Sequence, residues 1–95
     1  MKRAVISDST QWFDKDAAKE FLGKTGVGVF GNKSAFYEML YQTKKGIWVL
    51  YKGTTCLGMR DTYSVLSAEE CVAWMLRNEH IPGEELQSVM EGLEI

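Results

Sequence analysis

The sequence is poor in the residues that build metal centres and disulfide scaffolds. It has one histidine, His80, and two cysteines, Cys56 and Cys71, which lie 15 residues apart. Neither a His-x-x-x-His nor a Cys-x-x-Cys spacing occurs, so the ligand patterns of zinc sites are missing. Two cysteines are also too few for a disulfide scaffold. We expect two reduced thiols, with Cys71 in the core. A disulfide between the two cysteines is the alternative, because the sequence does not give the distance between them. No metal and no cofactor is predicted.

Long apolar runs and proline are scarce as well. Met1-Lys2-Arg3 is basic, but the apolar run behind it covers only residues 4–6, whereas a signal peptide needs about 7–15 residues. No run approaches the roughly 20 residues that span a membrane. The one proline, Pro82, argues against a proline-rich linker. We therefore expect a cytoplasmic protein of bacterial type with no membrane partner, folded as a single domain over residues 1–95.

Charge of both signs is present, but it is unevenly distributed along the chain. Residues 1–60 carry 10 Lys or Arg against 5 Asp or Glu, whereas residues 61–95 carry 1 Arg against 8 Asp or Glu. One interpretation is that both sets are solvated faces of one small fold. The other is a charge-polarised molecule that is steered toward a charged partner, or whose opposite ends meet head to tail.

Three apolar, β-prone runs predict an antiparallel meander with strands at residues 37–43, 47–52 and 61–66. Gly46 stands between the first two runs, at a turn position that favours positive φ. Both faces of the 47–52 strand are apolar. We therefore expect this strand to be covered on both faces, or one face to meet a partner.

The helices are predicted from caps and apolar stripes. Ser67 and Glu70 form a capping box, which predicts a helix from residue 68 to about Asn78. A second helix is predicted at residues 14–22 and a third around residues 84–93. The apolar face of the helix that follows Ser67 is predicted to comprise Ala68, Cys71, Val72, Met75 and Leu76, with Trp74 on its flank.

The fold class that follows is α+β. A three- to four-stranded antiparallel meander packs with two to three short helices, because a small sheet needs a covered apolar face. A short strand at residues 3–7 is expected to extend the sheet.

Residues 26–31 match the Gly-x-Gly-x-x-Gly pattern of dinucleotide-binding loops. That pattern needs a strand immediately before it and a βαβ unit around it. Here a helix is predicted before the motif and a hairpin soon after it. A turn-rich connection over residues 23–35 is the favoured interpretation, and a loop that touches a ligand is the alternative.

Two patterns carry a resemblance to known proteins: Leu40-Tyr41-x-Thr43-x-Lys45-Gly46-x-Trp48-x-Leu50 and Thr62-Tyr63-x-x-Leu66-Ser67-x-Glu69-Glu70-x-x-x-Trp74-Met75. Together with Trp12-Phe13-Asp14, they resemble a group of short uncharacterised bacterial proteins, many of them encoded on mobile or accessory DNA. The resemblance covers most of the chain and implies no activity. Members of the group have a longer, tryptophan-containing loop where this chain has residues 52–58, so no role of that loop carries over.

We predict a non-enzymatic interaction protein, a small regulator or inhibitor from mobile bacterial DNA that acts by protein–protein contact. Aromatic side chains are the usual anchors of protein interfaces, and acidic side chains steer a basic partner. The candidate partner contacts are Tyr41, Trp48, Tyr51, Trp74, Glu84, Glu85 and Glu91. For each aromatic residue, the alternative is burial in the protein's own core.

Two functions of other classes stay open. A nucleic-acid-binding regulator would use Lys44, Lys45, Lys52 and Arg60 beside the aromatic residues of the hairpin, although a pI of 5.4 weakens that interpretation. A small enzyme would use Cys56 as its nucleophile, with Arg60 as the nearest cation in the sequence. A homodimer is compatible with all three functions.

Overall fold

The computed structural model describes residues 2–23, 36–54 and 60–95. Its main sheet is a four-stranded antiparallel meander in the order β3 (Lys19–Leu22), β4 (Phe36–Gln42), β5 (Trp48–Thr54) and β6 (Thr62–Leu66). The other elements are β1 (Arg3–Val5), β2 (Trp12–Asp14), η1 (Lys15–Ala17), α1 (Ala68–Arg77), η2 (Glu84–Leu86) and α2 (Gln87–Leu93). The predicted α+β class is confirmed, together with the three-stranded meander and the helix after Ser67. The glycine motif at residues 26–31 and Cys56 lie outside the described residues.

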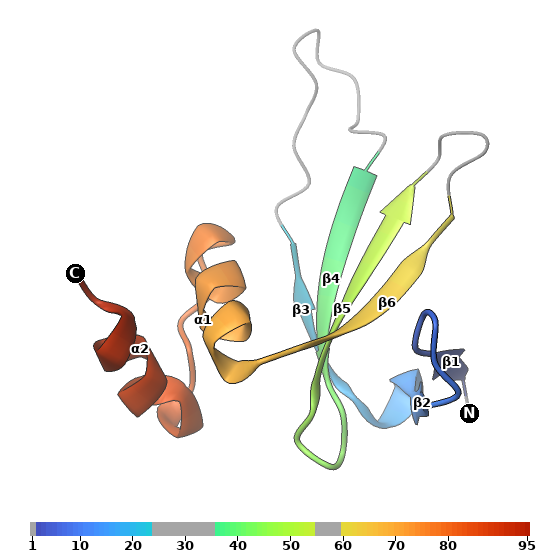
Figure 1. Ribbon diagram of the computed structural model, residues 1–95, viewed down its shortest axis with the longest axis horizontal. Helices are drawn as coiled ribbons and strands as arrows, with labels where there is room; N and C mark the ends of the chain where they lie inside the picture. Colours follow the sequence, from blue (N-terminus) through green and yellow to red (C-terminus); the bar gives the residue numbers. More distant parts are fainter. Residues whose placement is uncertain (1, 24–35, 55–59) are drawn as a thin grey trace, which may run out of the picture.

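The main sheet has a cover on each face (Figure 1). Alternation along β4 and β5 directs Leu40, Trp48 and Leu50 toward α1 and α2, where they form one core cluster. The neighbouring residues Tyr41 and Val49 point the other way, into a second cluster with the N-terminal sheet of β1 and β2. The expectation that both faces of the second hairpin strand are covered is therefore confirmed.

The turn between β4 and β5 is fixed by Gly46. Its backbone N–H donates to the Thr43 carbonyl at 2.8 Å, and the Thr43 N–H donates to the Ile47 carbonyl at 2.8 Å. Gly46 has a φ of +84°, a conformation that a residue with a Cβ adopts only at a cost. The position of the turn and its need for glycine are as the sequence predicts.

Helix α1 begins at the predicted capping box. The Ser67 hydroxyl accepts a hydrogen bond from the Glu70 N–H at 3.1 Å, and the Glu70 carboxylate accepts one from the Ser67 N–H at 3.0 Å. These bonds lower the pKa of the Glu70 carboxyl, the larger effect being the Ser67 backbone N–H. The helix start is therefore encoded locally.

Replacing Ser67 with alanine is expected to lower the free energy of unfolding by about 1 kcal/mol, because an N–H of the first turn loses its acceptor. Urea denaturation followed by circular dichroism measures the change. The matched control is Ser88→Ala, at an exposed position inside α2, where the expected change is within about 0.5 kcal/mol. Equal losses from both variants would contradict the capping role.

The predicted helix at residues 14–22 is wrong. The Asp14 carboxylate accepts the Asp16 N–H at 3.0 Å and caps only the short turn η1, after which Ala18 is extended. Residues 19–22 then pair with β4, with Phe21 opposite Leu40. Sheet pairing and the burial of an aromatic ring override the helix propensity of this segment.

β3 is held at its end by two further features. At Gly23, an added Cβ would lie 2.6 Å from the Glu38 carbonyl oxygen, so only glycine allows this close approach. The His80 ring nitrogen Nε2 lies 2.6 Å from the Leu22 carbonyl oxygen, and it must be the donor because a carbonyl only accepts. The edge strand is thereby tied to the end of α1.

Two smaller predictions are also corrected. Trp74, placed on the flank of its helix, is buried, whereas Leu76, placed on the apolar face, is exposed. The helix is rotated so that the larger indole ring is buried, which removes more apolar area from water.

The N-terminal strand does not extend the main sheet but pairs with β2. Only Ser7, beyond its end, bonds to β6, donating its N–H to the Tyr63 carbonyl at 2.9 Å.

Candidate functional site

The aromatic residues predicted as partner contacts lie mainly inside the molecule. Trp48, Trp74 and Tyr41 are buried, the first two in the core between the helices and the main sheet and the third under the N-terminal sheet. Tyr51 is half-buried and donates its hydroxyl to Asp61 at 2.8 Å. Burial, followed by hydrogen bonds to Tyr37 and Asp61, raises the pKa of Tyr51. These rings offer a partner little surface, and the contacts they make are those of core packing.

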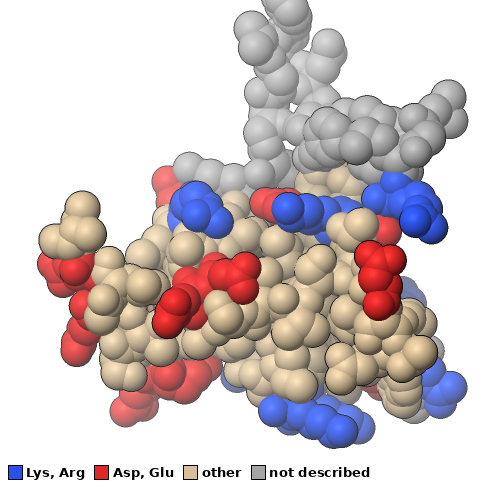
Figure 2. Space-filling view, in the orientation of Figure 1, with Lys and Arg blue, Asp and Glu red and all other residues tan. Residues whose placement is uncertain are grey.

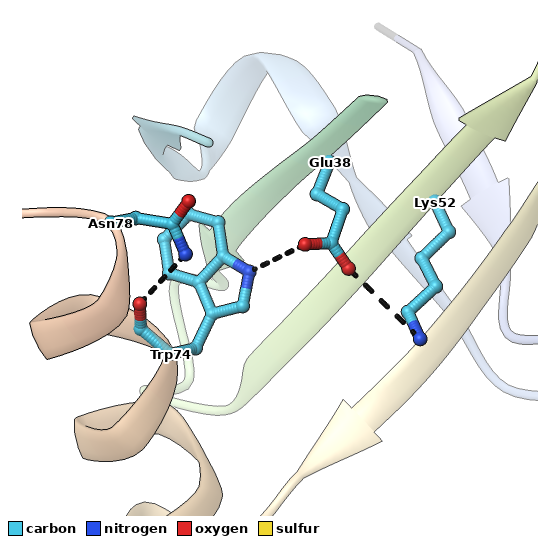
Figure 3. Close-up of polar contacts among 4 residues, drawn as sticks. All are labelled: Glu38, Lys52, Trp74 and Asn78. Carbon is cyan, nitrogen blue, oxygen red and sulfur yellow. Dashed lines mark hydrogen bonds and ion pairs between the residues drawn. The ribbon is translucent and has the colours of Figure 1, made fainter. Parts of the chain in front are cut away.

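Trp74 links α1 to the sheet through a short polar chain (Figure 3). Its Nε1–H donates to the Glu38 carboxylate at 3.4 Å, and the other oxygen of that carboxylate lies 3.9 Å from Lys52 Nζ. At the other side, the Asn78 amide donates to the Trp74 carbonyl at 2.8 Å. The indole also stacks on the His80 ring, with centroids 5.7 Å apart and planes at 10°. Trp74 is thus a structural residue that fixes the helix on β4.

The four basic residues predicted for nucleic-acid contact do not form one surface. Lys44 and Lys45 are exposed in the β4–β5 turn, whereas Lys52 lies near the other end of β5. Six residues lie between Lys45 and Lys52, most of them in the extended strand β5, so the two lysines are on the order of 20 Å apart. Arg60 lies just before β6, whose first residue Thr62 pairs with Lys52. The structure therefore divides the set into a turn pair and a pair at the opposite end of the sheet.

The turn pair borders an apolar groove with a volume of about 500 Å³. The groove is lined by residues of the N-terminal sheet and of the β4–β5 hairpin, and β6 contributes one lining residue, Val65. Its apolar lining comprises Ile6, Trp12, Phe13, Ile47, Val49 and Val65. We refer to this feature, with Lys44 and Lys45 on its rim, as the basic groove.

Three side chains of the basic groove are unusually exposed for their type. Trp12, Ile47 and Val65 are each 45–55% exposed. The Arg3 guanidinium lies 5.2 Å from the Trp12 ring centroid, close enough for a cation–π contact. Asp14, the one acidic residue in the lining, accepts hydrogen bonds from the N–H groups of Lys2 and Asp16. Exposed apolar groups bordered by cations are typical of an interaction surface.

The acidic residues gather at the other end of the molecule. Figure 2 shows red side chains gathered over α1 and α2, and blue ones at the β4–β5 turn, beside the N-terminal sheet and along the upper edge of the described part of the molecule. Glu84, Glu85 and Glu91, predicted as partner contacts, are all exposed there. Residues 67–95 contain seven glutamates against a single arginine, Arg77. The charge division along the sequence is therefore also a division in space.

The described residues show little capacity for metal binding or thiol chemistry. Residues 2–23, 36–54 and 60–95 contain no group of three or more His, Cys, Asp or Glu that could hold a metal ion. Cys71 is a free, buried thiol, and burial raises its pKa to about 12. A thiol that stays protonated is a poor nucleophile. The candidate nucleophile Cys56 lies outside the described part of the chain.

No protein-family model, curated protein or solved structure matches this chain. None of the helices in the described segments is long and apolar enough to cross a membrane.

Sequence reasoning missed Trp12, Ile47 and Val65 as surface residues. They come from three separate segments, and no local pattern joins them. The pair Trp12-Phe13 did carry a signal: adjacent residues of a strand point to opposite faces, so only one of the two rings could be buried in the same core. Phe13 is buried and Trp12 is exposed.

Proposed function

We propose that this protein is a non-enzymatic interaction module that binds a protein partner through the basic groove. The observation that carries the proposal is the groove itself, in which Trp12, Ile47 and Val65 are exposed beside Lys44 and Lys45. A tryptophan anchor often carries a large share of the binding free energy of a protein interface, and the residues around it exclude water from the contact. The lysines would select a partner segment that is apolar and acidic.

A role as a regulator or inhibitor encoded on mobile bacterial DNA, acting in the cytoplasm, is part of this proposal. It is supported by the resemblance of the hairpin and the capped helix to proteins of that origin. Small proteins that act by surface complementarity need only a stable scaffold and one good contact area. The two core clusters provide the scaffold, and the groove provides the contact area.

The test is an affinity pull-down of tagged protein from bacterial lysate, with and without nuclease, read by mass spectrometry. The double variant Trp12→Ala, Lys44→Glu is expected to lose a stoichiometric partner by at least tenfold, because it removes the exposed ring and reverses a rim charge. The control is Arg60→Glu, which reverses an exposed charge at the opposite end of the sheet and should capture as wild type does.

A partner that survives nuclease, is lost with the double variant and is retained with the control would support the proposal. A partner bound equally by all three proteins would contradict the groove as the contact. The melting temperature of each variant is measured first, so that a loss of capture is not a loss of fold.

A second candidate is single-stranded nucleic acid, favoured by the proximity of Trp12 and Arg3 to the two lysines of the turn. An exposed ring can stack on a base, and the lysines can contact phosphates. This candidate predicts that the logarithm of the binding constant for a fluorescent oligonucleotide falls with the logarithm of salt concentration, by about 0.7 per phosphate contacted. Binding that is absent at 50 mM salt removes it.

A further inference from the structure

A second, differently charged apolar surface lies on the helices. Leu76 and Leu93 are 53% and 44% exposed, and with Met90 they border a hollow of about 310 Å³ whose other lining residues are Glu91 and Glu94. We refer to these five residues as the acidic face. It is formed by α1, α2 and the residue after α2, on the opposite side of the main sheet from the basic groove (Figure 1).

The two surfaces are complementary in chemistry. The basic groove combines exposed apolar side chains with Lys44 and Lys45, and the acidic face combines exposed apolar side chains with Glu91 and Glu94. Each is therefore the kind of surface that the other would bind, since apolar contact provides affinity and opposite charge provides orientation and rate. Among the lining residues of the two surfaces, the one exception in sign is Asp14, whose carboxylate accepts hydrogen bonds from backbone N–H groups.

The surfaces cannot meet within one molecule, because the main sheet lies between them. We propose that the acidic face of one copy of this chain binds the basic groove of a second copy, so that the protein associates head to tail. This inference rests on the proposed function, because it uses the same groove and names a second copy as one of its partners. A contact between two different surfaces leaves one groove and one face free at the ends, so association continues beyond a dimer unless a ring closes.

The contact is expected to be reversible and sensitive to salt, because its polar part consists of exposed charges. Sedimentation equilibrium in 50 mM salt, between 10 and 500 µM protein, is expected to give an average mass that rises with concentration above the 10.8 kDa of one chain. Raising the salt to 500 mM should weaken association by at least tenfold.

Two variants make the geometry testable. The groove variant is Lys44→Glu, Lys45→Glu, and the face variant is Leu76→Glu, Leu93→Glu; all four positions are exposed. Each variant alone should stay at the mass of one chain. In the groove variant, the new glutamates repel Glu91 and Glu94 of the acidic face. In the face variant, charged carboxylates replace the apolar side chains that would pack into the groove, and burying them there is costly. An equimolar mixture retains one intact groove and one intact face, and it should form a 1:1 pair and stop there.

Other outcomes overturn the proposal. A wild-type protein that stays at the mass of one chain at 500 µM contradicts self-association, and the lysate capture then still tests the groove as a contact for another protein. A face variant that dimerises by itself indicates a symmetric contact instead. If the face variant fails to fold, Glu91→Gln with Glu94→Gln replaces it, and unchanged association by that protein contradicts the charge pairing.

Discussion

Replacing Trp74 with alanine is expected to lower the free energy of unfolding by about 3–5 kcal/mol, as is replacing Trp48. The two rings are 2% and 7% exposed, and both belong to the core between the helices and the sheet. Replacing Trp74 also removes the stacking of its ring on His80 and its hydrogen bond to Glu38. Against the total stability of about 5–15 kcal/mol typical of a small domain, either loss brings the protein close to unfolding.

Trp12 is the matched control within the same chain. It is 55% exposed, so Trp12→Ala is expected to change the free energy of unfolding by less than about 1 kcal/mol. Urea denaturation followed by far-ultraviolet circular dichroism measures all three variants, because tryptophan fluorescence differs among them. A tolerated Trp74→Ala together with a destabilising Trp12→Ala would contradict the placement of these rings.

The same three variants separate stability from binding. Trp12→Ala should weaken partner capture while the fold remains intact, whereas Trp48 and Trp74 should affect capture only through loss of fold. The more conservative Trp74→Phe keeps most of the buried area and loses the N–H donor. It is expected to fold with an intermediate loss of stability and to capture the partner normally.

The thiol of Cys71 is expected to react with iodoacetamide at pH 8 about a thousandfold more slowly in the native protein than in denaturant. Burial, with a smaller contribution from the charge of Glu85, raises its pKa from 9.0 to about 12. At pH 8 the reactive thiolate is then about one part in ten thousand instead of about one in ten. The measurement uses the Cys56→Ser variant, in which Cys71 is the one remaining cysteine.

The converse variant, Cys71→Ala, retains only Cys56, so its labelling rate is the control for reaction at a site other than Cys71. Native and denatured rates for Cys71 that agree within tenfold would contradict its burial. A native rate that depends on urea at low concentration would show that labelling proceeds through opening of the core.

The same pKa shift makes stability depend on pH. Above pH 9 the unfolded chain releases the Cys71 proton, and the folded chain retains it until about pH 12, so the free energy of unfolding falls as pH rises through this window. The loss is about 1 kcal/mol at pH 10. Burial raises the pKa of Tyr41, which adds a loss in the same direction. The difference between wild type and Cys71→Ala, measured from pH 8 to pH 10, isolates the contribution of the thiol.

Much of the fold was predictable because its signals are local. The meander follows from β-prone runs around a turn that needs Gly46 at positive φ, and α1 follows from the reciprocal bonds of Ser67 and Glu70. The charge division could also be read from the sequence alone. Each of these features depends on residues that are close along the chain, so no knowledge of the rest of the fold was needed.

Only the tertiary structure decided how residues distant in sequence meet. Residues 19–22 carry a helix-compatible pattern, and they became a strand because β4 offered hydrogen bonds and Trp48 offered a ring for Phe21 to pack against. For the same reason Trp74 became part of the buried face of α1: Leu40, Trp48 and Leu50 of the sheet supplied the apolar surface against which its ring packs.

Apart from Lys44 and Lys45, which the sequence already indicated as exposed cations of the turn, the candidate site belongs to this second category. Trp12, Ile47 and Val65 are far apart in the chain and face one groove only because the N-terminal sheet packs against β5 and β6. The sequence by itself determined the three strands β4, β5 and β6, the capped helix and the sign of the charge in each half. The tertiary structure decided which aromatic rings are core and which are surface, because burial depends on the neighbours that distant segments supply.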